Sequence, residues 1–197
     1  MDNIAWTLQE AVAFEQEIKK SRFVGRAAPI SDISETETIL ADWRISDATH
    51  NAWAWRFRGH ARCADDGEVS GTAGRQILSV IEKSQGDCIL VMVSRFYGGI
   101  RLGAGGLARA YGGTAAACLD LGIRRELIPM TSVRLHVPFA CSSAVFQHLV
   151  QIGISEREES YVSDGLILTV KLTISQAEAL AIALPGLTRG EGVLERC

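Results

Sequence analysis

Alternation of apolar and polar residues predicts strands and helices in turn along the first part of the chain. Trp6 to Ile30 is predicted to hold two strands, the second being Arg22 to Ile30, joined by the polar turn IKKS. Ser34 and Glu37 have the S-x-x-E spacing of a capping box, and the apolar stripe around them predicts a helix that ends near Ser46.

Two apolar patterns follow in the middle of the chain. In NAWAWRF, aromatic residues take every second position at Trp53, Trp55 and Phe57, which predicts a strand with one aromatic face. The run CILVMV, Cys88 to Val93, is apolar at every position and predicts a central strand covered on both faces. Between them a helix is expected, with Ser70 or Thr72 as its N-cap. Its buried stripe is Ile77, Leu78 and Ile81.

A glycine-rich segment follows the central strand directly. SRFYGGIRLGAGGLARAYGG holds seven glycines between Gly98 and Gly113, and the small-residue stretch TAAACLDLG after it predicts a helix ending near Gly122. Glycine permits another group to approach the backbone closely, so this turn is a candidate binding element.

The pattern changes beyond Pro129 to the order βαββαβ, the ferredoxin-like split unit. The predicted elements are a strand Thr131 to Phe139, a helix Ser142 to Gln151, strands Ile154 to Val162 and Leu166 to Ile174, a helix Gln176 to Ala183 and a strand Gly190 to Arg196. Ser175 and Glu178 suggest a capping box for the second helix. With a boundary at Arg125 to Met130, we expect an α+β protein with domains at residues 1–125 and 130–197.

Composition limits the function classes. The chain has 47% hydrophobic and 22% charged residues with a net charge of -3, which is typical of a globular protein and gives no global attraction to nucleic acid or anionic membrane. Any RNA contact must therefore use a local patch. The five cysteines are scattered without a CxxC pair, which predicts reduced thiols and a cytoplasmic protein. The start MDNIAWTLQE lacks a signal-peptide pattern and no apolar run is long enough for a membrane span.

Three carboxylates precede the predicted second helix in ADDGEVSGTAG. Asp65, Asp66 and Glu68 could hold Mg²⁺ through oxygen ligands, or the helix start could bind phosphate. The alternative is structural, because acidic residues stabilise a helix N-terminus and DDG is a common turn sequence. Both interpretations stay open on the sequence.

The glycine-rich segment also carries Arg95, Arg101 and Arg109, interleaved with aromatic residues. Free N–H groups, guanidinium groups and stacking rings suit a phosphate-bearing ligand or an RNA strand. GAGGLA matches a dinucleotide-binding pattern only weakly, and GK[ST] of a nucleotide-binding P-loop is absent. The predicted ligand-binding residues are Arg95, Tyr97, Gly98, Gly99, Arg101, Gly103, Gly105, Gly106, Arg109, Ser70, Thr72 and His50. No catalytic residue is assigned, because His50 lies beside no nucleophile motif.

Four segments together resemble the IMPACT/YigZ family: SRF, HNAWAW, DDGEVSGTAG and RFYGGIRLGAGGLARAYGG. The resemblance covers the first domain to about Leu121 by motif and the tail by pattern. Two positions depart from it, since Ala52 stands where relatives usually carry cysteine and Val69 replaces the proline of DDGEPSGTAG. Ala52 argues against thiol chemistry there, while Val69 keeps the carboxylates of the turn.

The resemblance implies a first domain of the left-handed βαβ type found in a small-subunit ribosomal protein, in GHMP kinases and in elongation factor G. It implies a ferredoxin-like second domain. Eukaryotic members are linked to starvation control of translation through a partner of an initiation-factor kinase, and bacterial members have no agreed activity.

We therefore expect a non-catalytic, translation-associated protein that binds RNA or the ribosome through its glycine- and arginine-rich turn. A nucleotide- or phosphate-binding protein or enzyme with a carboxylate-held metal ion is one alternative. A protein-interaction module is the other. No cofactor is expected, with Mg²⁺ as the exception if the carboxylates form a metal site.

Overall fold

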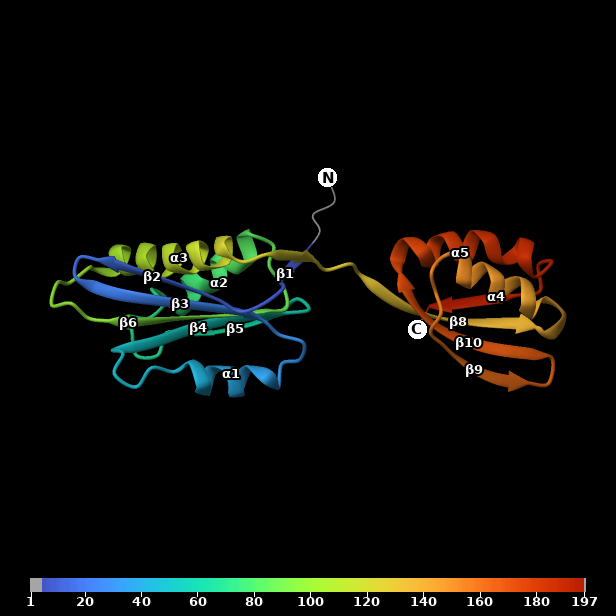
Figure 1. Ribbon diagram of the computed structural model, residues 1–197, viewed down its shortest axis with the longest axis horizontal. Coiled ribbons are helices and arrows are strands. Elements are labelled where there is room, and N and C mark those ends of the chain that lie inside the picture. Colours follow the sequence, from blue (N-terminus) through green and yellow to red (C-terminus); the bar gives the residue numbers. More distant parts are fainter. Residues whose placement is uncertain (1–4, 197) are drawn as a thin grey trace. The chain divides into compact units, whose positions relative to one another are not determined.

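The computed structural model describes residues 5–196 and shows an α+β protein, which confirms the predicted fold class (Figure 1). The chain divides into two compact units, Met1–Leu127 and Ile128–Cys197. Within residues 5–196, every helix is too short or too polar to cross a membrane.

The first unit is built on one five-stranded sheet in which all neighbours are antiparallel. The strand order is β2-β3-β6-β4-β5. The bounds are β2 (Val12–Ile18), β3 (Ser21–Pro29), β4 (His50–Phe57), β5 (His60–Ala64) and β6 (Ile89–Phe96). A short pair, β1 (Trp6–Leu8) with β7 (Arg124–Glu126), joins the start of this unit to its end.

Helices cover both faces of this sheet (Figure 1). α2 (Gly74–Lys83) and α3 (Ala104–Leu121) lie on one face, and α1 (Glu35–Trp43) lies on the other. β6 is the middle strand, and alternate residues such as Val91 and Leu90 belong to the cores on opposite faces. The expectation of a central strand apolar on both faces is confirmed.

The core beneath α1 explains the aromatic strand. Trp55 and Phe57 of β4 are buried with Ile30 and Leu90, and partly buried residues of α1 pack against them. The predicted capping box of α1 is wrong. Ser34 has helical backbone angles (φ -61°, ψ -24°) instead of the extended ones of an N-cap residue, so its hydroxyl accepts no bond from the first turn and donates to Asp32.

α3 begins at Ala104, much earlier than the predicted helix after Gly113. Four of the seven glycines are therefore helical. Glycine costs about 1 kcal/mol relative to alanine in a helix interior, but burial of a large apolar side chain contributes about 1.5–3 kcal/mol. Leu107 and Tyr111 are buried on this part of α3, so packing outweighs the low helix propensity.

The second unit has the predicted element order βαββαβ. It contains β8 (Met130–Pro138), α4 (Ser142–Gln151), β9 (Arg157–Val162), β10 (Gly165–Thr173), α5 (Ile174–Leu187) and β11 (Val193–Arg196), with a 3-10 turn at Phe139–Cys141. The strand order is β11-β8-β10-β9, and both helices cover one face (Figure 1). The capping box of α5 is formed by Thr173 and Gln176, not by Ser175 and Glu178, since the helix begins earlier than predicted.

Candidate functional site

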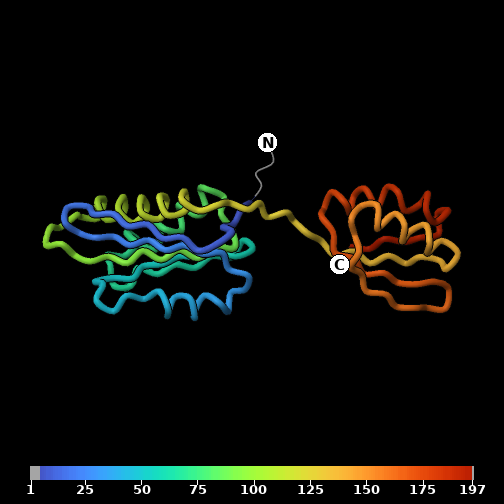
Figure 2. Tube along the Cα trace, viewed as in Figure 1, coloured from blue at the N-terminus to red at the C-terminus, as the bar shows by residue number. Residues whose placement is uncertain are grey.

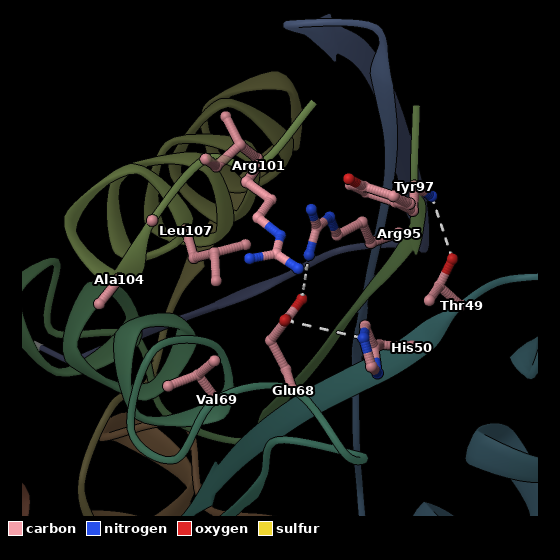
Figure 3. A pocket seen from close by; sticks show the side chains of 11 residues that line it. Thr49, His50, Glu68, Val69, Arg95, Tyr97, Arg101, Ala104 and Leu107 are labelled. Atoms are coloured by element: carbon pink, nitrogen blue, oxygen red, sulfur yellow. Dashed lines mark hydrogen bonds and ion pairs between the residues drawn. The ribbon is translucent and has the colours of Figure 1, made fainter. Parts of the chain in front are cut away.

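A cavity of about 440 Å³ opens in the first unit where β4 begins and β6 ends (Figure 3). The turn before α2 and the N-terminus of α3 complete its wall. The lining residues are Thr49, His50, Glu68, Val69, Arg95, Tyr97, Arg101, Leu102, Gly103, Ala104 and Leu107. Both family-like segments, DDGEVSGTAG and the glycine-rich segment, thus contribute to one cavity.

Asp65 organises the turn before α2 and is half-buried. One carboxylate oxygen accepts bonds from the backbone N–H groups of Ala73 (3.1 Å) and Gly74 (2.8 Å), and the other accepts from Gly71 (2.8 Å). A carboxylate at this position satisfies the free N–H groups of α2 and stabilises its dipole.

The predicted N-cap of α2 at Ser70 or Thr72 is therefore wrong. Ala73 is the N-cap residue, with no side-chain bond of its own, because Asp65 supplies the cap from outside the helix. The Thr72 hydroxyl donates instead to the Val69 carbonyl at 2.6 Å, and Ser70 is exposed. Neither hydroxyl lines the cavity.

Asp66 holds the turn against β4 and the end of α1. Its carboxylate accepts a bond from the Asn51 backbone N–H at 2.7 Å and forms an ion pair with Arg44 at 3.2 Å. The Asp66 carbonyl lies 3.0 Å from Nδ1 of His50. These contacts fix the turn and orient the His50 ring at the cavity wall.

Glu68 lies at the floor of the cavity and has three partners. Its carboxylate pairs with Arg95 at 2.6 Å, accepts a bond from the Tyr111 hydroxyl at 3.0 Å and lies 3.6 Å from Nε2 of His50 (Figure 3). The three carboxylates of the turn thus bind separate protein donors. In residues 5–196, no group of three or more His, Cys, Asp or Glu side chains is arranged to hold a metal ion.

Arg95 is held between two aromatic rings. Its guanidinium carbon lies 5.8 Å from the centre of the Phe23 ring and 5.5 Å from that of Tyr97, so the group is stacked as well as paired. Arg95 is only 5% exposed, and its Nε has no hydrogen-bond partner among the described residues. This arginine is therefore mainly part of the cavity floor, whereas Tyr97 at the rim is 48% exposed.

Burial and the neighbouring Glu68 carboxylate raise the pKa of Tyr111 far above its ordinary value, because both disfavour the phenolate. The hydroxyl therefore stays protonated and keeps donating to Glu68.

We expect one of the three tyrosines to stay protonated at a pH where an ordinary phenol, of pKa about 10, has titrated. A folded pKa above the unfolded value contributes stability below the unfolded pKa, and this contribution is lost at higher pH. A titration to alkaline pH, in which phenolate absorbance and circular dichroism are followed together, tests this. In Tyr111→Phe, no phenolate signal should remain coupled to unfolding.

The N-terminus of α3 points its backbone toward the cavity. Gly103 precedes the helix with a φ of 70°, a conformation that glycine adopts without strain. No side chain caps this N-terminus, and the first turn contains no acidic residue. Arg101 extends from the preceding loop into the cavity (Figure 3).

Arg109 returns to the same helix end. A Cβ at Gly105 would lie 3.8 Å from Nη1 of Arg109, so the guanidinium lies over the first turn of α3. Arg109 is exposed and forms no ion pair with residues 5–196.

The turn between β2 and β3 adds two further cations. A Cβ at Gly98 would collide with the Lys20 carbonyl, so only glycine permits this close approach. The β2–β3 turn, which carries the exposed Lys19 and Lys20, therefore packs by its backbone against the loop that carries Arg101. Both segments lie at one end of the unit (Figure 2).

Only some of the predicted ligand-binding residues line the cavity: His50, Arg95, Tyr97, Arg101 and Gly103. The others, Gly98, Gly99, Gly105, Gly106, Arg109, Ser70 and Thr72, lie outside its lining. Sequence reasoning missed the apolar wall formed by Val69, Leu102 and Leu107. It also missed the pairing of Glu68 with Arg95, for which residues 27 positions apart give no local signal.

The two positions that depart from the family resemblance lie in different surroundings. Ala52 is fully buried in β4, away from the cavity lining, whereas Val69 is 56% exposed and forms part of that lining. Among the described residues the four cysteines Cys63, Cys88, Cys118 and Cys141 are free thiols, and burial raises the pKa of Cys118 to about 11. Cys197 lies outside the described residues.

The fold and the cavity define an α+β protein with a cation-bearing pocket at a helix N-terminus. The Impact N-terminal domain matches residues 19–119. This chain belongs to the IMPACT family.

Relatives and a solved structure agree with that assignment. An IMPACT family member from Thermus thermophilus is 39% identical over 174 residues, covering 88% of this chain and 96% of the relative. YigZ of Escherichia coli is 33% identical over 194 residues, covering 94% and 95%. A crystal structure of a hypothetical protein is similar with a TM-score of 0.71 at 27% identity, covering 98% of this chain and 97% of that one.

Proposed function

We propose that this protein is a cytoplasmic, translation-associated RNA-binding protein whose contact surface is the basic rim of the cavity. The rim consists of Lys19, Lys20, Arg101 and Arg109, and this name is used for those four residues below. The observation that carries the proposal is their placement, since all four are exposed. Arg101 lines the cavity and Arg109 lies over the first turn of α3, while the turn with Lys19 and Lys20 packs by its backbone against Gly98, in the loop that carries Arg101. On a chain of net charge -3, such a local patch is what phosphate contact requires.

The rim suits a phosphate backbone better than the carboxylate turn suits a metal ion. Asp65 and Asp66 already accept bonds from backbone N–H groups and from Arg44, and Glu68 is neutralised by Arg95. The exposed ring of Tyr97 beside the rim provides a surface on which a base can stack. Arg95 belongs to the cavity floor and not to the rim. Of the three arginines that the sequence suggests as a patch, the rim therefore includes only Arg101 and Arg109.

We expect Arg101→Glu to weaken binding of single-stranded RNA or of ribosomes by a similar factor for different sequences. Phosphate contacts act through counterion release, so the slope of log affinity against log salt should become shallower by about one unit per lost contact. Folding should change by no more than about 0.5 kcal/mol, because Arg101 is exposed. The measurement is fluorescence anisotropy across a salt series, with circular dichroism as the folding check.

Arg58→Glu is the matched control. The substitution changes the charge as Arg101→Glu does, at a residue that is also exposed. Arg58, however, follows the end of β4 that is far from the cavity. At about 3.3 Å per residue, that end lies roughly 25 Å from His50 at the cavity. Equal weakening by both variants would mean that only net charge matters. If Arg101→Glu binds as well as the wild type, the proposed surface is wrong and a protein partner becomes the better explanation.

A further inference from the structure

The first turn of α3 presents unused hydrogen-bond donors to the cavity. Leu107 is the first residue of the helix whose N–H bonds back, to the Gly103 carbonyl at 2.9 Å. The N–H groups of Ala104, Gly105 and Gly106 have no acceptor among residues 5–196, and no side chain caps them. Free N–H groups at a helix start, with the positive end of the dipole, favour an anion.

Arg95 is a second, independent indication of a ligand. A guanidinium has five N–H donors. Only one bond from Arg95 to the described residues is found, from Nη1 to Glu68, although the residue is 5% exposed and lines the cavity. The Nε–H of Arg95 is buried without a partner among the described residues. Buried donors are almost always bonded, so this unpaired donor beside the cavity favours an acceptor there.

The balance of charge favours a doubly charged anion. Arg95 and Glu68 cancel, which leaves Arg101, the overlying Arg109 and about half a positive charge from the start of α3. A phosphate monoester carries about -1.5 to -2 charges at neutral pH, whereas a phosphodiester within a strand carries one. The monoester therefore matches the site more closely.

The cavity has room for more than the phosphate. Its volume of about 440 Å³ falls in the range of small-ligand pockets, and Leu102, Leu107 and Tyr97 provide apolar surface. A sugar and its base can lie against this surface while the phosphate occupies the start of α3.

We propose that the cavity binds the terminal phosphate monoester of a nucleotide chain, with the α3 N-terminus, Arg101 and Arg95 as its donors. This inference rests on the proposed RNA-binding function and names the part of the RNA that enters the cavity. The rim then contacts the phosphodiesters that follow.

Gly105→Asp tests the site without threatening the fold. A Cβ at residue 105 meets only the flexible end of Arg109, at 3.8 Å, and a carboxylate in the first turn suits a helix N-terminus. It repels a phosphate there. Gly113→Asp is the matched control, because it makes the same change in the same helix at an exposed position with no atom within 4 Å.

The experiment compares short single-stranded RNAs of one sequence that carry a 5′-phosphate, a 3′-phosphate or hydroxyls at both ends. We expect one phosphorylated RNA to bind about tenfold or more tightly than the hydroxyl form, as charge-assisted hydrogen bonds are lost without the phosphate. Gly105→Asp should remove this preference and Gly113→Asp should keep it. Adenosine 5′-monophosphate and inorganic phosphate are titrated alongside.

The outcomes separate the two claims. If all three RNAs bind equally to the wild type and Arg101→Glu weakens them all, the terminal-phosphate site is overturned and RNA binding stands. If adenosine 5′-monophosphate binds and no RNA does, the monoester site stands and RNA binding is overturned. Absence of binding by every probe overturns both. A preference that Gly105→Asp leaves unchanged, while the Tm confirms a folded variant, overturns the terminal-phosphate site alone.

Discussion

Glu68→Ala is expected to destabilise the first unit by about 3–5 kcal/mol, since removal of one partner leaves a buried charge without its counterpart. The Glu68 side chain is 6% exposed, as is that of Arg95, and their atoms are 2.6 Å apart. Tyr111 also loses its acceptor. Urea unfolding followed by circular dichroism measures the change, as a lower midpoint with an unchanged slope.

The double variant Glu68→Leu with Arg95→Met is the control for this prediction. Replacing a whole buried pair by apolar residues is often nearly neutral, so we expect it to recover most of the lost stability. A loss of less than about 1 kcal/mol in Glu68→Ala would show that Arg95 is well solvated without Glu68, contrary to its burial.

Asp65→Ala is the second large effect. Three backbone N–H groups, those of Gly71, Ala73 and Gly74, lose their acceptor, and α2 loses the carboxylate at its N-terminus. Caps contribute about 0.5–2 kcal/mol and hydrogen bonds to charged groups about 1.5–3 kcal/mol, so we expect a loss of about 2–4 kcal/mol in the free energy of unfolding.

Asp42→Ala, at an exposed position of α1, should stay within about 0.5 kcal/mol of the wild type in the same unfolding experiment. A similar small change for Asp65→Ala would contradict the assigned cap. Asp65→Asn should fall between the two, because an amide oxygen still accepts a hydrogen bond without the charge.

Periodicity predicts much of the fold because burial on a helix or strand face leaves a local pattern. α4 is predicted at its observed bounds, Ser142–Gln151, and the aromatic alternation of β4 marks the core under α1. Some errors fall in strands: Trp6 to Ile30 holds three strands where two are predicted, and β9 and β11 each begin three residues later than predicted. The other errors fall at helix starts. The cap of α2 comes from a residue nine positions before Gly74, and α3 passes through glycines that local propensity disfavours.

The cavity is less predictable than the fold for the same reason. Composition of the glycine-rich segment indicates a binding element, and His50, Arg95, Tyr97, Arg101 and Gly103 do line one cavity. Arg95 is the buried arginine because its guanidinium lies near the rings of Phe23 and Tyr97 and pairs with Glu68. Contacts between residues so far apart produce no recognisable local pattern in the sequence.

Amide chemical-shift mapping during titration with single-stranded RNA tests the central claim most directly, because the proposed contacts include backbone N–H groups. We predict the largest shifts at Ala104, Gly105 and Gly106, with smaller shifts at Arg101 and Lys20, and their loss in Arg101→Glu. Shifts confined to the second unit, with these amides unchanged at saturating RNA, would contradict the account.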